Sequence, residues 1–244
     1  MKKNLLPFLF LSIFSYCQDK ANIDHLYPPE NIKIKYHDHW GKNNYKKIIK
    51  EFKKSPLEFG DIVFLGNSIT QGGKDWSKRL SYPNIKNRGI GGDVTDGVLA
   101  RINEITYFKP RAVFLLIGIN DLYNNSPSTP SPEYVGNNIV RIANVIKNNS
   151  PNTQVFVQTT LPINRLKEVG LFNNEKHKKN IKKVNSIIKL NEDNNIYNVI
   201  DLYSAFVNSK GFIIKDLSYD GVHLSEKGYQ VWVDFIRSTV HSIK

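Results

Sequence analysis

Short apolar runs alternate with helical patterns from Asp61 to the end of this chain. The apolar runs predict strands over residues 62–65, 84–87, 112–117, 154–159 and 197–200. Between them, apolar residues recur at intervals of three and four, the spacing of one buried helix face. Strands that alternate with helices pair in parallel, because each crossover helix returns the chain to the same end of the sheet. The sequence therefore predicts an α/β fold, with helices on both faces of a parallel sheet of about five strands.

Two of the helical patterns carry start signals. The pattern over residues 94–105 predicts one helix, with Asp93 or Thr95 as its cap. The next helix is predicted to begin at Ser131, a favourable cap that is followed by proline at the first helical position. Further helices are predicted over residues 45–53, 175–190 and 225–241.

The composition fits one globular domain. A chain of 244 residues with 40% hydrophobic and 23% charged residues can bury a substantial core. We assign residues 57–244 to this domain. Residues 18–56 are a polar lead-in whose short helix is expected to pack on the domain.

Residues 1–17 have the order of a secretory signal. Lys2 and Lys3 precede an apolar run, and Ser15 and Cys17 supply small residues at its end. The run is too short for a stable transmembrane helix. Two outcomes stay open: cleavage after Cys17 gives a periplasmic or secreted protein, whereas a lipid on Cys17 anchors the protein at the membrane. Cys17 is the only cysteine, which excludes cysteine and thiolate–metal chemistry.

The formal net charge is +12, and loss of Lys2 and Lys3 with the signal lowers it by 2, to +10. A basic surface can attract nucleic acid, anionic lipid or acidic polysaccharide. The lysines are, however, interleaved with asparagines over residues 42–54 and 176–189, as on solvated helix faces. No motif combines aromatic and basic residues as nucleic-acid-binding modules do, so nucleic acid is not an expected partner.

The run from Phe64 to Thr70, FLGNSIT, ends a strand in a tight turn that presents the Ser68 hydroxyl. A serine hydroxyl becomes a useful nucleophile when a base accepts its proton during attack. His223 is the favoured base among six histidines, because Asp220 precedes it by three residues and can orient its ring. Taken alone, His223 fits equally well as a loop residue that caps the following helix.

The other histidines fit surface positions better than a metal site. His37 and His39 could form a metal pair, but no third ligand lies nearby in the sequence, so we expect both to be exposed. His25, His177 and His241 are also expected at the surface.

Two further blocks supply donors for an oxyanion. Gly91 and Gly92 stand at a strand-to-helix turn, where glycine permits close approach of backbone amides to a substrate. Asn120 can add a side-chain amide. Each block alone is also typical of a plain turn or helix cap, and the lysine and hydroxyl of a nucleotide-binding loop are missing. Because Ser68, Gly92 and Asn120 each follow a predicted strand, all three are expected at the carboxyl edge of the sheet, where ligands bind.

Together these blocks resemble the SGNH hydrolases, the GDSL-type esterase family, from about residue 61 to residue 244. The resemblance implies a flavodoxin-like three-layer α/β/α fold and ester hydrolysis without metal or cofactor. It implies that Ser68, Asp220 and His223 are catalytic, and that the Ser68 amide, Gly92 and Asn120 form the oxyanion hole. Asn67 departs from the family pattern, which usually has aspartate before the serine.

The residues of these blocks are most similar to one branch of the family, which comprises platelet-activating-factor acetylhydrolase subunits and bacterial sialate or carbohydrate O-acetylesterases. That branch favours short acyl groups. We therefore expect an exported acetylesterase acting on glycans, with a small-molecule or glycan acyl ester as its substrate and membrane attachment only through a lipid on Cys17. The oligomeric state is left undetermined. Residues that could shape the acyl pocket are Leu122, Tyr123, Leu161, Pro162 and Val222.

Three other functions are considered beside this one. The first is a lysophospholipase or thioesterase that acts on longer acyl chains. The second is a catalytically silent glycan-binding module of the same fold, and the third is a nucleic-acid binder that uses the basic surface.

Overall fold

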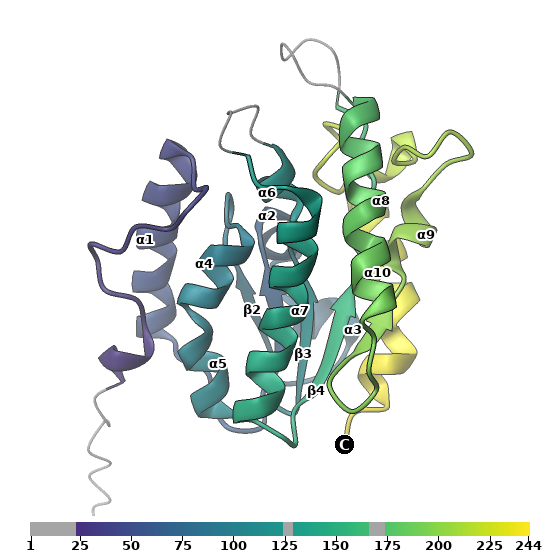
Figure 1. The fold of residues 1–244 in the computed structure, drawn as a ribbon. Coiled ribbons are helices and arrows are strands. Elements are labelled where there is room, and N and C mark those ends of the chain that lie inside the picture. The colour runs from purple at the N-terminus through teal and green to yellow at the C-terminus, as the bar shows by residue number, and fades with distance from the viewer. Residues whose placement is uncertain (1–22, 124–128, 166–173) are drawn as a thin grey trace, which may run out of the picture.

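The computed structural model describes residues 23–123, 129–165 and 174–244. Within these residues, five strands form one parallel sheet in the order β2-β1-β3-β4-β5, with helices on both faces (Figure 1). The strands are β1 (Ile62–Gly66), β2 (Ile85–Gly89), β3 (Ala112–Leu116), β4 (Gln154–Gln158) and β5 (Asn198–Ile200). The predicted three-layer α/β/α fold is confirmed, and this strand order is flavodoxin-like.

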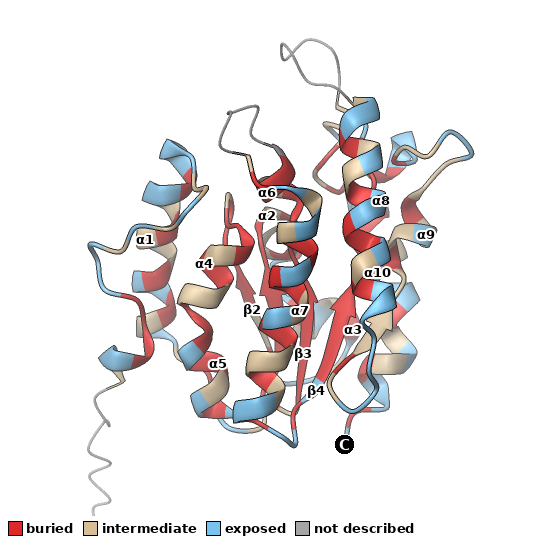
Figure 2. Cartoon of the chain, viewed as in Figure 1, coloured by how far each residue is buried: buried red, intermediate tan, exposed pale blue. Residues whose placement is uncertain are grey.

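Helices α4, α5, α7 and α8 pack side by side on one face of the sheet, whereas α3 and α10 cover the other (Figure 1). The helices are α1 (His39–Lys54), α2 (Ser68–Gly72), α3 (Trp76–Leu80), α4 (Thr95–Ala100), α5 (Ile102–Phe108), α6 (Ile119–Tyr123), α7 (Pro132–Asn149), α8 (Asn174–Leu190), α9 (Leu202–Phe206) and α10 (Glu226–His241). Because both faces are covered, β1 and β3 are buried along their whole length (Figure 2).

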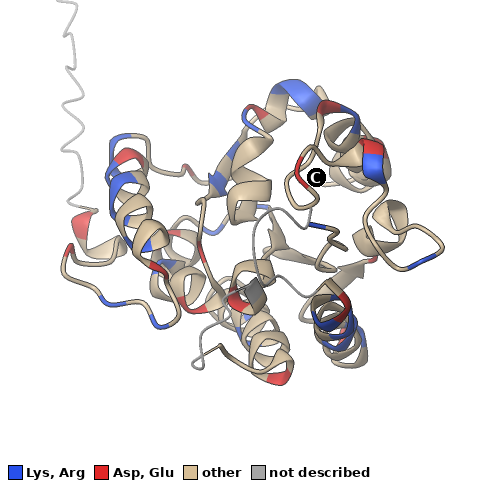
Figure 3. Ribbon diagram, turned by 90° about the horizontal axis from the view of Figure 1, so that it is seen from above, with Lys and Arg blue, Asp and Glu red and all other residues tan. Residues whose placement is uncertain are grey.

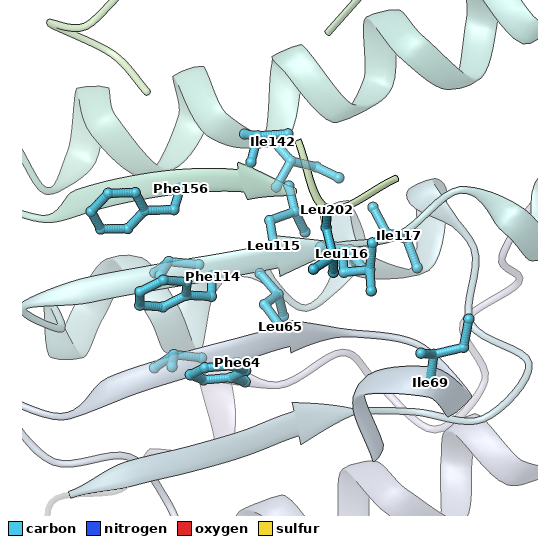
Figure 4. Close-up of a cluster of buried hydrophobic side chains, with 14 of the residues drawn as sticks. Phe64, Leu65, Ile69, Phe114, Leu115, Leu116, Ile117, Ile142, Phe156 and Leu202 are labelled. Atoms are coloured by element: carbon cyan, nitrogen blue, oxygen red, sulfur yellow. The ribbon is translucent and has the colours of Figure 1, made fainter. Parts of the chain in front are cut away.

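An aromatic row crosses the middle of the sheet. Phe64, Phe114 and Phe156 stand in register on β1, β3 and β4, with ring centroids 4.9 and 4.8 Å apart (Figure 4). Trp76 of α3 stacks on Phe64 at 4.4 Å, and Trp232 of α10 meets Trp76 edge-on at 4.7 Å. These contacts fix α3 and α10 against the strand that leads to Ser68.

The single helix predicted over residues 94–105 is wrong: it is two helices, α4 and α5, that meet at Arg101. Arg101 leaves the helical conformation, with φ −113°, and its buried guanidinium turns back to the Asp93 carboxylate and the Gly66 carbonyl. The expected cap is also wrong, because neither Asp93 nor Thr95 is the N-cap of α4. Instead, the Asp121 carboxylate accepts the Thr95 amide at 3.0 Å. A residue of the distant helix α6 thus caps α4, and local sequence could not indicate that.

Two histidines expected at the surface are buried, His37 and His177. The side chain of His37 is 2% exposed, because it lies against the buried carboxylate of Asp93. His177 stands four and seven residues before Ile181 and Val184, on the face of α8 that is buried. It therefore belongs to the apolar stripe of the helix and not to its lysine-rich face.

The lead-in forms a longer helix than predicted, and it is hydrogen-bonded to a buried ion pair between β2 and α5. Helix α1 begins six residues before the predicted start at residue 45. At its far end, Glu104 of α5 binds Arg88 of β2 at 2.8 Å and accepts hydrogen bonds from the Tyr27 hydroxyl and the Leu57 amide. Partners on both sides of α1 thus converge on one buried carboxylate.

Lysines and arginines lie on several of the peripheral helices, with acidic residues between them (Figure 3). No helix in the described ranges is long and apolar enough to cross a membrane.

We predict that Glu104→Ala lowers the free energy of unfolding by about 3–5 kcal/mol, because it leaves the Arg88 guanidinium buried without its counter-charge. Urea denaturation followed by circular dichroism measures this. Glu51→Ala is the control, since it removes an exposed ion pair with Lys54 and should cost less than about 1 kcal/mol. Equal losses in the two variants would contradict the role given to Glu104.

Candidate active site

Ser68 stands at the carboxyl end of β1, as the first residue of α2. The strand ends at Gly66, and the Asn67 side chain caps the helix by accepting the Ile69 amide at 3.0 Å. Asparagine and aspartate are equally good caps, so the departure from the family pattern at Asn67 leaves this turn intact. The Ser68 amide, as the first of the helix, has no acceptor within α2 and lies at the positive end of its peptide dipoles.

The ring of His223 connects Ser68 to Asp220. Its Nε2 lies 2.9 Å from Ser68 Oγ, and its Nδ1 lies 2.7 Å from Asp220 Oδ2. With the proton on Nδ1, the ring donates to the carboxylate and accepts from the serine hydroxyl. The hydroxyl, the ring and the carboxylate thus form one continuous hydrogen-bonded array.

The loop that carries Asp220 and His223 is folded around the carboxylate. Asp220 Oδ1 accepts the amides of Val222 and His223 at 2.9 and 2.7 Å. Partial burial acts to raise the pKa of Asp220, but the hydrogen bonds from the His223 ring and the two amides outweigh it, and the pKa lies below its usual value. The Asp220 carboxylate is therefore ionised at neutral pH and can serve as the anionic partner of the His223 ring.

Gly92 packs against the start of α1. It adopts φ +78°, in the left-handed region that favours glycine, and a Cβ there would lie 2.8 Å from the Gly41 Cα atom and 2.9 Å from the Trp40 ring. Its neighbour Gly91 donates its amide to the Gln71 side chain and accepts from the Asn44 side chain, at 2.8 and 2.9 Å. The glycine pair is thus held from α2 and from α1 at once.

The side chain of Asn120, the other candidate donor to an oxyanion, is fixed by Asp93, whose carboxylate is fully buried. Its Oδ2 accepts Arg101 Nε at 2.9 Å, and its Oδ1 lies 3.1 Å from His37 Nε2. Its backbone carbonyl accepts Asn120 Nδ2 at 2.9 Å, and Arg101 also donates to the carbonyl of Gly66 at 3.1 Å. Asp93 thereby ties the loop of Gly92, the side chain of Asn120 and the end of β1 into one network.

A cavity of about 190 Å³ lies over these groups. It brings together the five residues that the sequence assigned to catalysis and the oxyanion hole: Ser68, Gly92, Asn120, Asp220 and His223. It also includes residues that the sequence analysis missed, namely Tyr36, Asp38, Trp40, Val94 and Arg165. Three of those five belong to the lead-in, whose place over the sheet edge depends on tertiary contacts. In the sequence, the one indication that this segment could reach the site is its concentration of aromatic and ionisable residues, YHDHW at 36–40.

Of the residues proposed for the acyl pocket, one lines the cavity and three do not. Val222 lines the cavity. Leu122 and Leu161 are buried in the hydrophobic core, and Pro162 is also buried, and none of the three is among the lining residues. The side chain of Tyr123 lies outside what the structure describes.

A sequence model described as "GDSL-like Lipase/Acylhydrolase family" matches residues 64–231, more than half of the chain. The chain belongs to the GDSL-like lipase/acylhydrolase family. The resemblance to SGNH hydrolases is thereby confirmed, and esterase or acylhydrolase chemistry follows from it.

Characterised relatives and solved structures agree with this GDSL-like hydrolase assignment. The chain is 27% identical over 196 residues to platelet-activating factor acetylhydrolase IB subunit alpha1 of Bos taurus, covering 78% of this chain and 77% of that protein. A GDSL-like lipase from Bacteroides thetaiotaomicron has a TM-score of 0.67 at 22% identity, covering 81% of this chain and 97% of the other. An acetylxylan esterase from Geobacillus stearothermophilus has a TM-score of 0.56 at 17% identity, covering 75% and 95%. At these identities the two structures establish the shared fold.

Within the described ranges, no group of three or more His, Cys, Asp or Glu side chains is arranged to hold a metal ion. His37 faces Asp93, and His39 lies 3.2 Å from the Asn43 side chain on the surface of α1. His37 and His39 thus have different neighbours, one in the interior and one at the surface.

Asp121, next to Asn120, supplies a pH-dependent contribution to stability. Burial raises its pKa to about 7, against the hydrogen bonds from Thr95 that favour the charged form. In the unfolded chain the pKa is near the ordinary value of about 4, so the folded state binds one more proton between these two values. The contribution of Asp121 to stability is thus fully present below about pH 4 and is lost as the pH rises through 7.

We predict that the free energy of unfolding of the native protein falls by about 1 kcal/mol per pH unit from pH 5 to pH 7 relative to that of Asp121→Asn. Urea denaturation of both proteins at several pH values measures this difference. Asp234→Asn, at an exposed position of α10, is the control and should follow the native protein at every pH. A constant difference between native protein and Asp121→Asn would contradict the titration.

Proposed function

We propose that this GDSL-like hydrolase is an exported serine esterase that removes short acyl groups, above all O-acetyl groups on carbohydrates. The observation that carries the proposal is the 2.9 Å contact between Ser68 Oγ and His223 Nε2, inside the cavity that Gly92 and Asn120 also line. Export rests on residues 1–17, which lie outside the described residues.

In the proposed mechanism, Ser68 Oγ attacks the ester carbonyl carbon while its proton moves to His223 Nε2. Asp220 orients the ring and stabilises its positive charge. His223 then gives the proton to the alcohol oxygen as the bond to the acyl carbon breaks. Water attacks the acyl-enzyme, again losing a proton to His223, and Ser68 recovers its proton as the acid leaves.

The developing oxyanion needs donors that are fixed before the reaction begins. The amides of Ser68 and Gly92 are two candidates. The third is Asn120 Nδ2, which has two hydrogens: one is donated to the carbonyl of Asp93, and this leaves the other for the substrate. Because Asp93 is held by Arg101, the Asn120 amide cannot rotate freely away from the cavity.

Two observations support a short acyl group on a polar alcohol. Among the lining residues that the structure describes, only Val94 and Val222 are aliphatic, so few of these side chains can pack along a long alkyl chain. The names of the relatives point the same way, since one is an acetylhydrolase and another an acetylxylan esterase.

We predict that Ser68→Ala lowers kcat/KM for p-nitrophenyl acetate by about 10⁴-fold or more, because the nucleophile is lost. Ser204→Ala, which alters an exposed hydroxyl of α9, is the matched control and should keep the native rate. Labelling of the native protein by an organophosphonate, absent in Ser68→Ala, tests the silent glycan-binding alternative. A Ser68→Ala protein with the native rate would overturn the mechanism.

We predict that kcat/KM for p-nitrophenyl acetate exceeds that for the octanoate by about tenfold or more, since a small pocket rejects the longer chain. Stopped-time assays with both esters at the same enzyme concentration measure the ratio. The reverse order would favour the lysophospholipase or thioesterase alternative.

A further inference from the structure

One wall of the cavity comes from the lead-in. Tyr36, Asp38 and Trp40 line it together with Ser68 and His223. These three residues precede the segment 64–231 that matches the family. The reaction centre thus lies in the family part of the chain, whereas this wall is added by a segment outside it.

The wall is held in place before any substrate arrives. The ring of Tyr36 packs edge-on against Tyr134 of α7, with centroids 5.6 Å apart. Tyr36 also has φ +68°, a left-handed conformation that costs a residue with a side chain about 1–3 kcal/mol. Further along, Gly41 packs on the carbonyl of Gly92, and Asn44 donates to the carbonyl of Gly91. A strained segment fixed at both ends indicates a preorganised binding surface.

Trp40 is the conspicuous member of this wall. Its six-membered ring lies against Gly91 and Gly92, yet 60% of the residue is exposed. The other tryptophans, Trp76 and Trp232, are fully buried. An indole that is pinned on one side and open on the other offers a flat apolar platform beside the reacting groups.

Polar groups border this platform. Asp38 Oδ1 caps α1 by accepting the Gly41 amide at 2.6 Å. Its Oδ2 accepts no hydrogen bond in the part of the chain that the structure describes, and Asp38 is exposed on the cavity wall. A carboxylate oxygen is a strong acceptor for hydroxyl groups.

We propose that Trp40 is the platform for the pyranose ring of an acetylated sugar, and that Asp38 accepts a hydrogen bond from one of its hydroxyls. This inference rests on the proposed function and assigns its substrate subsite. A sugar ring has an apolar C–H face and a polar edge, and the wall has the matching order of indole and carboxylate. An acyl chain has no polar edge that would use the Asp38 carboxylate.

The first test uses substrate selectivity. Acetate release is measured on mono-O-acetylated methyl xylopyranosides, on vinyl acetate, which lacks a ring, and on acetylcholine. Trp40→Ala should lower kcat/KM for the sugar ester about tenfold more than for vinyl acetate, chiefly through KM, and Trp40→Phe should restore most of the loss. Phe59→Ala, at an exposed aromatic residue just before the opposite end of β1, is the control and should leave the ratio unchanged.

Each contrary result has its own meaning. An equal loss on sugar ester and vinyl acetate would show that Trp40 merely supports Gly91 and Gly92, and would overturn the platform. No loss on either, or a selective loss on acetylcholine, would overturn it as well.

Asp38→Asn tests the carboxylate separately, because asparagine can still cap α1 with its oxygen. The variant should raise KM for the sugar ester several-fold, by about three- to tenfold, while its urea midpoint stays native. An unchanged KM would remove Asp38 from the subsite.

A second measurement does not require catalysis. Because Trp40 is the one exposed tryptophan among the three in the chain, quenching of the fluorescence by acrylamide reports on it. In Ser68→Ala, methyl xylopyranoside should protect the fluorescence from quenching, whereas Ser68→Ala/Trp40→Ala should show little quenching with or without the sugar, which assigns the signal to Trp40. Protection without hydrolysis by the native protein would sink the proposed function but keep the platform, whereas hydrolysis without protection would do the reverse.

Discussion

The buried carboxylate of Asp93 is the contact on which the site depends. It follows Gly92 directly, and its backbone carbonyl fixes the side chain of Asn120. Arg101 neutralises it and also binds the carbonyl of Gly66, where β1 ends before Ser68. A buried charge demands good partners, so this network has little freedom to rearrange. Gly92, Asn120 and Ser68, the proposed oxyanion donors and nucleophile, are thereby held in one frame.

The sheet delivers the residues to this frame. Phe64, Phe114 and Phe156 stand in register across β1, β3 and β4, and this row aligns the ends of the strands. Ser68 and Asn120 follow the ends of neighbouring strands on the two sides of the switch in strand order, where a crevice forms. His223 comes from a distant loop, and its own amide together with that of Val222 shapes the turn around Asp220.

The lead-in contributes more than packing. His37 reaches the Asp93 carboxylate, while Trp40 and Gly41 lie on the glycine pair. The same segment therefore supports the loop of Gly91 and Gly92 and forms a wall of the cavity.

The sequence by itself determined the layout of the fold and the chemistry. Strand periodicity, the Ser131 cap and the blocks around Ser68 and His223 are local signals, because each depends on neighbours within a few residues. Only the tertiary structure decided that Arg101 breaks a helix, that Asp121 caps α4, and that His37 is buried. It also decided that Trp40 lines the cavity while Leu122 and Leu161 lie in the core. Those outcomes depend on contacts between residues far apart in the chain, and no local pattern encodes which distant group will complete a buried charge or cover a glycine.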